Sequence, residues 1–319
     1  MDKKFQFATG YDISALPAYI DQNRLPLISE MVLGADSLQY FKKQLGVKGT
    51  SVLNIMSLDP TVSCGSSCGF SAGDAPALSQ KNIVTNLFKV NLEICPEQMV
   101  NTWAEFALQV KANKTEMPFE EHLVGLLINR IKENIEMNIW QGDTDGGGTY
   151  TCIDGLLAQA TPVDLTCYCA DSGYYGLVTA AYATFAKSKY VAGKRVNIFL
   201  PPEVYDLFAM ELVAKNLYHY NPENVENYTY IPGTNVRVIR TLGLTGTGVI
   251  VCSTEDNLYA GMDMLSDAEE LKIWYSDDFD VWRVKAKWNI GVTFAFDNEF
   301  AAYTICDDLK DGIAVCEGA

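Results

Sequence analysis

The sequence has little positive charge. Among its 319 residues, Lys and Arg total 24 while Asp and Glu total 40, which gives a formal net charge of −16 at pH 7. Binding nucleic acid through phosphate neutralisation needs clustered cations, and binding an anionic membrane needs a basic surface. The charge balance therefore argues against both functions. The contents of glycine (24), proline (11) and aromatic residues (11%) likewise exclude collagen-like, coiled-coil and disordered chains.

Long uninterrupted apolar runs are also missing. The N-terminus, Met-Asp-Lys-Lys-Phe-Gln, mixes polar and apolar residues, so we expect no secretory signal. The most apolar helix-like stretch, 119–141, contains charged residues such as Arg130, Lys132 and Glu133. Such charges are costly inside a bilayer, so this stretch is not predicted to span a membrane. We expect a soluble protein made in a reducing cytosol.

Cysteine is present in an odd number. Nine cysteines without a signal peptide are poor evidence for a disulfide scaffold, and buried free thiols are the simpler interpretation. Cys64 and Cys68 together with Cys167 and Cys169 could supply four thiolates to zinc, but their spacings are not those of zinc ribbons or fingers. We therefore predict no metal and no cofactor, and keep a cytosolic metal-binding protein or enzyme as an alternative.

Recognisable catalytic motifs are scarce. The chain has two histidines and lacks a serine-hydrolase elbow, a His-Glu-x-x-His helix and a Gly-x-x-x-x-Gly-Lys phosphate loop. The glycine-rich segment 243–248 has no following Lys and precedes an expected strand, so it is interpreted as a β-turn. Segment 143–148 resembles the start of a calcium loop, but the ligands expected at its fifth and twelfth positions are missing. We predict a protein that is not an enzyme.

Residues 1–46 contain short apolar clusters interrupted by proline and polar residues. Proline removes an amide donor and restricts the residue before it, so these clusters favour extended segments. Only Asp36 to Lys43 is typical of a short helix, with Asp36 as its N-cap. We predict an extended arm that docks its apolar residues on another surface.

A long β-hairpin is predicted next. Its first strand is expected at 50–56, and its second where Val90, Leu92 and Ile94 alternate with polar residues. The stretch between them, 57–81, exceeds the ~12–15 residues of ordinary loops, so it is interpreted as functional or mobile. A two-stranded hairpin alone is marginal in water. It must therefore lie against another surface, for which the chain offers no local partner.

Two helices are expected after the hairpin. Pro96 suits the first position of one helix. The other is predicted over 117–141, where apolar residues recur at three- and four-residue steps before Gly142. At ~1.5 Å per residue, roughly 24 residues span ~36 Å, against a mean helix length of ~11–12 residues. This helix is interpreted as a structural spine.

The remainder predicts a mixed α+β pattern in one folding unit. Helices are expected over 172–187 and 201–217, with a strand at 195–200 between them. Further strands are expected at 235–240, 248–252, 271–275, 281–288 and 291–296. Segment 276–280 is interpreted as a hairpin turn. The uncovered arm, the unpaired hairpin and the long helix are all explained if identical neighbours supply the missing surface.

Several short motifs carry a resemblance that runs through residues 1–305. They are Cys68-Gly69-Phe70, Cys95-Pro96 with Trp103, Ile139–Asp143, Asp154–Leu157, Asn257–Asp263, Trp274–Ser276 and Gly291–Phe296. In this order the motifs and elements resemble the major capsid proteins of tailed bacteriophages, with the Hong Kong-97 type fold. The resemblance implies an arm (1–46), an extended loop (47–94), a peripheral domain (95–190 and 262–305), an axial domain (191–261) and a C-terminal tail (306–319).

The resemblance also implies a function and partners. The expected protein is a structural subunit that assembles with itself into pentamers and hexamers around double-stranded DNA in a virion, after synthesis in the host cytoplasm. Portal, scaffolding and decoration proteins are expected partners. An encapsulin-like compartment, which shares the fold and encloses protein, is an alternative. The predicted inter-subunit contacts are Leu16, Ile20, Leu27, Ile28, Cys64, Cys68, Phe70, Val90, Leu92, Ile94, Asp277, Asp278 and Asp280.

Overall fold

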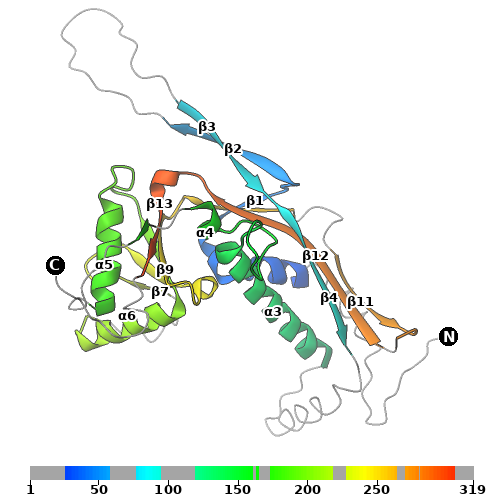
Figure 1. Cartoon of the computed structure of the whole chain (residues 1–319). Coiled ribbons are helices and arrows are strands. Elements are labelled where there is room, and N and C mark those ends of the chain that lie inside the picture. The colour runs from blue at the N-terminus through cyan, green and yellow to red at the C-terminus, as the bar shows by residue number, and fades with distance from the viewer. Residues whose placement is uncertain are drawn as a thin grey trace, which may run out of the picture.

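A computed structural model describes residues 26–57, 77–94, 119–160, 163–164, 173–217, 228–263, 270–279 and 281–305. Within these residues the chain forms a body of two sheets with flanking helices, from which a two-stranded hairpin projects (Figure 1). The predicted mixture of helices and strands is therefore confirmed. The helix predicted after Pro96 lies outside the described residues.

The first sheet is organised around one long strand, β12. Its strands are β1 (Lys42–Leu45), β4 (Asn86–Ile94), β10 (Leu258–Met262), β11 (Glu270–Ser276) and β12 (Val281–Phe294). Strand β12 pairs antiparallel with β4, β10 and β11, and β1 joins β10 in parallel. The even-numbered residues of β12 from Trp282 to Ile290 are buried, because alternate side chains point to one face of a strand. That face forms one side of the main core.

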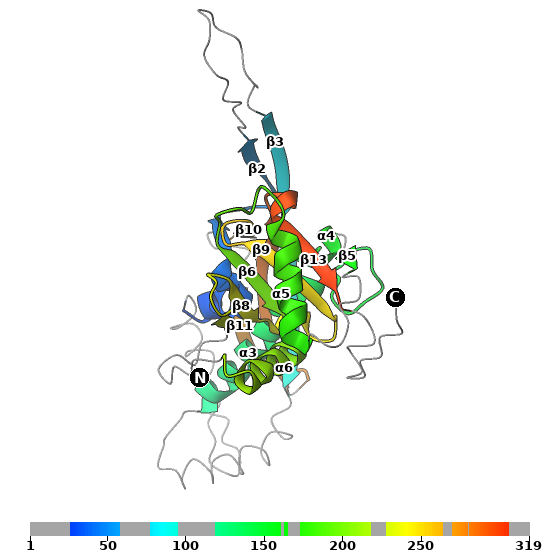
Figure 2. The same ribbon diagram turned by 90° about the vertical axis from the view of Figure 1, so that its left-hand side faces the viewer.

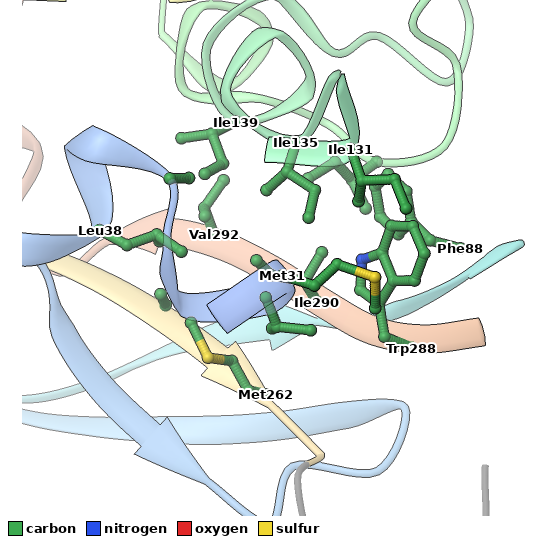
Figure 3. Close-up of a cluster of buried hydrophobic side chains, with 14 of the residues drawn as sticks. Met31, Leu38, Phe88, Ile131, Ile135, Ile139, Met262, Trp288, Ile290 and Val292 are labelled. Atoms are coloured by element: carbon green, nitrogen blue, oxygen red, sulfur yellow. The ribbon is translucent and has the colours of Figure 1, made fainter. Parts of the chain in front are cut away.

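Helix α3 (Phe119–Gln141) covers this buried face and confirms the predicted spine helix. Figure 3 shows its isoleucines Ile131, Ile135 and Ile139 pointing toward Trp288 and Ile290 of β12. The three isoleucines follow at four-residue steps, which places them on one side of the helix. Helix and sheet thus share one hydrophobic core.

The second sheet has six strands in the order β5-β13-β9-β6-β8-β7. Their bounds are β5 (Val163–Asp164), β6 (Val196–Leu200), β7 (Tyr228–Tyr230), β8 (Arg237–Arg240), β9 (Val249–Thr254) and β13 (Phe300–Thr304). Helices α5 (Gly173–Ala186) and α6 (Pro202–Ala214) lie together beside it (Figures 1 and 2). Both β6 and β9 are buried along their whole lengths, so this sheet has a core of its own.

Shorter helical elements complete the described part of the chain. They are the helical residues 26–33, η1 (Asp36–Tyr40), α4 (Leu156–Gln159), η3 (Leu242–Leu244) and η4 (Asp297–Glu299). The predicted helix beginning at Asp36 is shorter and tighter than expected, and Ala35 rather than Asp36 occupies its N-cap position. The strands predicted at 281–288 and 291–296 are one continuous strand, β12.

The hairpin differs from the predicted one in its strand pairing. Strand β2 (Thr50–Ser57) pairs with β3 (Ala77–Val84), not with the strand that contains Val90. That later strand, β4, pairs with β12 of the same chain. Only Thr85 separates β3 from β4, so the chain passes from the projecting hairpin into the first sheet at this residue. Strand β4 alternates apolar and polar residues, but alternation alone does not determine which strand it pairs with.

The predicted arm also differs in its second half. Met31, Val32 and Leu38 have no exposed surface and belong to the main core. In Figure 3, Met31 and Leu38 point into the same cluster as Met262 and Val292. Residues 26–41 are therefore part of the body, whereas the first 25 residues lie outside the described part of the chain.

Candidate assembly surfaces

The projecting hairpin has two different faces. In its register Val52 pairs with Asn82, and Thr50 pairs with Val84 on the same side, while Ile83 lies on the opposite side. Val52 is 46% exposed and Val84 52%, whereas Ile83 is fully buried. One face of the hairpin is thus packed on the body, and the other presents valine, threonine and amide side chains to solvent.

The edges of the hairpin are unpaired within the described part of the chain, because its sheet has only the strands β2 and β3. Strand β2, with the sequence Thr-Ser-Val-Leu-Asn-Ile-Met-Ser, contains no charged residue and no proline. Native edge strands usually carry such residues, which prevent pairing with another chain. The edge of β2 is therefore suited to strand addition.

Two glycines form the seat of the hairpin. Gly261 of β10 and Gly291 of β12 are directly paired. A Cβ atom at Gly261 would lie 2.8 Å from Cγ2 of Ile83, and one at Gly291 would overlap the carbonyl of Val84. The absence of both side chains lets the root of the hairpin cross closely over the sheet.

Polar contacts fix the hairpin on this seat. The backbone N–H of Thr85 donates to the carbonyl of Gly49 at 2.7 Å, and its hydroxyl donates to the same carbonyl at 2.9 Å. Further out, the ammonium of Lys81 lies 2.6 Å from Oδ1 of Asp297 and 3.5 Å from the centroid of the Phe294 ring. The direction of the hairpin is thus set by the chain itself.

The C-terminal end of α3 joins three parts of the body. Glu136 is 2% exposed and accepts hydrogen bonds from the backbone N–H and hydroxyl of Ser37 and from Nε1 of Trp140. Burial raises the pKa of Glu136, and the hydrogen bonds from Ser37 and Trp140 offset part of this effect. On the next turn, Gln141 donates to the carbonyls of Gly243 at 2.7 Å and Thr245 at 3.1 Å. The spine helix therefore holds both the segment around η1 and the turn after η3.

The turn between β11 and β12 lies where it was predicted. Asp277 and Asp278 are exposed, and Phe279 is 66% exposed with its ring 4.7 Å from the guanidinium carbon of Arg283. Among the described residues, neither aspartate forms an ion pair. This turn is a second accessible surface on the body.

Some predicted contact residues are located and others are not. Leu27 and Ile28 are buried in the chain's own core, so the prediction that they dock on a neighbour is corrected. Val90 and Ile94 are partly buried against the same core, and Leu92 is 40% exposed. The remaining predicted contacts lie outside the described residues: Leu16, Ile20, Cys64, Cys68, Phe70 and Asp280.

Two exposed apolar surfaces were missed by the sequence analysis. One is the pair Val52 and Val84 on the hairpin, and the other is the outer side of α6, with Leu207, Met210 and Val213. In α6 the buried residues follow at four-residue steps, yet the opposite side is also apolar. A helix that is apolar on both sides indicates a second contact surface, and this signal is visible in the sequence.

No metal centre is found in the described part of the chain, where no three His, Cys, Asp or Glu side chains converge. The cysteines considered for zinc lie outside it. Cys252 is buried, and burial raises the pKa of its thiol, which keeps it protonated and unreactive. None of the described helices is both long and apolar enough to cross a bilayer.

Comparisons of sequence with known proteins find nothing: no family model and no curated protein matches the chain. Comparison with solved structures, in contrast, does find matches. A chain of the satellite phage P4 procapsid, solved with its size determination (Sid) protein, superposes with a TM-score of 0.55 over 89% of this chain and 98% of that one, at 11% identity. The chain has the fold of a phage capsid protein.

Other solved structures share this fold. A chain from Gordonia phage Cozz gives a TM-score of 0.54 at 14% identity and covers 85% of this chain and 86% of that one. The capsid of an empty GTA particle with C5 symmetry gives 0.52 at 8% identity, over 85% and 90%. The predicted Hong Kong-97 type fold is therefore confirmed over the 85–89% of the chain that these structures cover.

Proposed function

We propose that this chain is a structural shell subunit, without catalytic activity, that assembles with itself into pentamers and hexamers around double-stranded phage DNA. The observation that carries the proposal is the shared fold, which extends over 98% of the P4 procapsid chain. The projecting hairpin supports it independently, because a two-stranded sheet with an uncharged edge is marginal alone and is suited to pairing with another chain.

The proposed mechanism is strand addition between copies. The exposed face with Val52 and Val84 would lie over a neighbouring subunit, while the seat at Gly261 and Gly291 holds the hairpin in place. The arm before residue 26 would dock Leu16 and Ile20 on a neighbour. Each contact can be weak, because a closed shell engages many at once.

The acidic balance of the chain suits a container for DNA. A net charge of −16 disfavours tight adhesion of packaged DNA to the wall and leaves the DNA free to move. Portal, scaffolding and decoration proteins would be its partners, and the virion its final location.

Nuclease protection tests the contents of the shell. Particles purified from producing cells are expected to retain double-stranded DNA after nuclease treatment, as detected by gel electrophoresis. Particles that enclose a defined protein and no protected DNA would instead indicate an encapsulin-like compartment. Absence of particles altogether would contradict the shell function itself.

A further inference from the structure

An apolar pocket lies where α5, α6 and the turn before β9 meet the end of β13. The residues that line it include Tyr174, Val204, Leu207, Gly248 and Ile305. Its volume is about 240 Å³. An apolar cavity of about 150 Å³ is large enough to hold a benzene molecule. The pocket therefore has room for at least one large apolar side chain.

The pocket continues onto the exposed apolar side of α6. Leu207 belongs to the pocket lining and is 41% exposed. Met210 is 67% exposed and Val213 61%, and both follow Leu207 at three-residue steps, which places the three side chains on one side of the helix. These three residues form the α6 face. Contiguous apolar surface of this kind usually binds another surface.

The acidic side chains beside the α6 face already have partners. Oε1 of Glu203 accepts a hydrogen bond from the backbone N–H of Gly246 at 2.9 Å. Oδ1 of Asp206 accepts one from Nε of Arg240 at 3.2 Å. What the pocket and the α6 face offer a covering segment is thus mainly apolar surface, so the covering segment must supply apolar side chains.

The chain itself leads from this pocket into its C-terminal tail. The backbone N–H of Ile305 donates to the carbonyl of Gly248 at 2.7 Å, and the Ile305 side chain is 2% exposed and lines the pocket. Residues 306–319 therefore begin at the pocket wall. They lie outside the described residues and also outside the resemblance to capsid proteins, which assigns them no role.

The tail has the length and the apolar residues needed to cover this surface. It contains Leu309, Ile313 and Val315. At ~3.3 Å per residue of extended chain, Leu309 can lie up to ~13 Å beyond the last described residue and Ile313 up to ~26 Å. The α6 face from Leu207 to Val213 spans only ~9 Å along the helix axis, at ~1.5 Å per residue. Reach therefore does not limit the contact.

We propose that residues 306–319 bind across the pocket and the α6 face of their own chain, with Leu309 at the pocket and Ile313 and Val315 on the α6 face. The tail is favoured over a second copy as the covering segment because it is tethered at the pocket wall, which gives it a high effective concentration. Closing so short a connection also costs little entropy. The contact lies within one chain and does not depend on the proposed shell function.

Chemical labelling of the α6 face tests the contact. Met210→Cys is introduced into the full chain and into a chain that ends at Ile305, and its alkylation by iodoacetamide is followed by peptide mass spectrometry. Alkylation at position 210 is expected to be at least tenfold slower in the full chain. Cys152, which is exposed, is the internal reference and should react equally in both chains. Equally fast alkylation at position 210 in the two chains would overturn the proposal.

Substitutions in the full-length tail provide a test that does not rely on the folding of the shortened chain. Ile313→Ser with Val315→Ser is expected to raise the alkylation rate at position 210 to near that of the chain without a tail, because the apolar contact is lost. Asp311→Ser with Glu317→Ser is the matched control and should keep the protection. Loss of protection in both variants, or in neither, would contradict the assigned roles of these residues.

Dilution separates the chain's own tail from other covering surfaces. Protection by the tail of the same chain should be unchanged over a tenfold dilution at micromolar concentration. Protection that disappears on dilution, or that persists in the chain ending at Ile305, would mean that a second copy covers the α6 face and would refute the proposal. Failure of the full chain to form particles would refute the shell function but would leave this result unaffected.

Discussion

At the scale of single residues, Glu136 links stability to pH. Burial raises its pKa, hydrogen bonds from Ser37 and Trp140 lower it, and the nearby charge of Asp36 raises it further. The net direction is upward, so the folded chain holds this proton more tightly than the unfolded chain does. The resulting stabilisation is complete below the unfolded pKa of the carboxyl group and is lost as pH rises through the folded pKa.

Glu136→Gln is therefore expected to remove this part of the pH dependence. The amide keeps an acceptor for Ser37 without a charge to bury, so the variant should be at least as stable as the wild type at pH 8. Glu136→Ala should instead lose about 1–3 kcal/mol, because Ser37 and Trp140 keep buried donors without this partner. Urea unfolding between pH 4 and pH 8 measures the difference between variant and wild type. Parallel pH profiles for the wild type and the glutamine variant would contradict this role.

Gly291 is expected to tolerate no side chain. A methyl group there overlaps the backbone carbonyl of Val84, so either the sheet or the root of the hairpin must move. Overpacking of this kind typically costs about 1–3 kcal/mol. We therefore expect Gly291→Ala to lower the free energy of unfolding by that amount and to reduce particle formation. Chemical denaturation and sedimentation measure the two effects.

Gly125→Ala is the matched control for this substitution. Gly125 lies in α3 with open space where its Cβ would be, so the change should stabilise the helix by about 0.5–1 kcal/mol and leave assembly intact. Equal behaviour of the two alanine variants would show that the glycine seat does not position the hairpin.

At the scale of secondary-structure elements, the sequence predicted those helices and strands that depend on interactions between residues close together in the chain. Helix α3 and helix α6 were predicted from their apolar steps and their end signals, and strand β6 from its apolar run. Strand β4 pairs with residues of β12 about 190 positions further along the chain, and no sequence pattern in either strand indicates this partner. Strands β10 and β13 were missed because glycine and alanine interrupt their β-branched or aromatic residues.

The sequence was limited in the same way for the candidate assembly surfaces: it indicated where elements lie but not which of their residues are exposed. The first strand of the hairpin and the turn at 276–279 could be predicted, because strand-forming and turn residues are local signals, whereas the second strand of the hairpin was predicted at the wrong place. Which residues remain exposed depends on what the rest of the chain covers: Leu27 and Ile28 are as apolar as Val52 and Val84, yet only the valines are accessible. Exposure is a property of the assembled tertiary structure.

Deleting residues 57–80 is expected to leave a folded monomer that does not form closed particles. The deletion keeps Lys81 and Ile83, which hold the hairpin root on the body, and removes the projecting part. Thermal unfolding should therefore stay close to that of the wild type, while sedimentation should show no particles. Particles of normal size and yield from this variant would remove the hairpin from the mechanism.

Two truncations separate the arm from the core. A chain that begins at Val47 loses Met31, Val32 and Leu38, all fully buried, and should not fold. A single large-to-small change in a core already costs about 2–5 kcal/mol, out of a typical total of about 5–15 kcal/mol. A chain that begins at residue 25 keeps these residues and lacks Leu16 and Ile20.

The shorter truncation is expected to fold but to assemble with reduced yield. Circular dichroism checks the fold, and size-exclusion chromatography measures the yield of particles. Unchanged yield from the chain that begins at residue 25 would show that the arm does not bind neighbours.

At the scale of the whole molecule, the fold favours contact between copies, whereas the net charge opposes it. The body has two hydrophobic cores of its own, whereas the hairpin presents two exposed valines and an open strand edge that another copy could cover. Copies with a charge of −16 repel each other at long range, so contact depends on short-range burial and on local charge pairs. Assembly is therefore expected to be sensitive to ionic strength.

Electron microscopy of the purified full-length chain is the most direct test of self-assembly. At micromolar concentration and moderate salt, negative staining should reveal hollow closed shells built from five- and six-membered rings. A homogeneous 35.3 kDa monomer under the same conditions, with the hairpin surface left uncovered, would contradict the account.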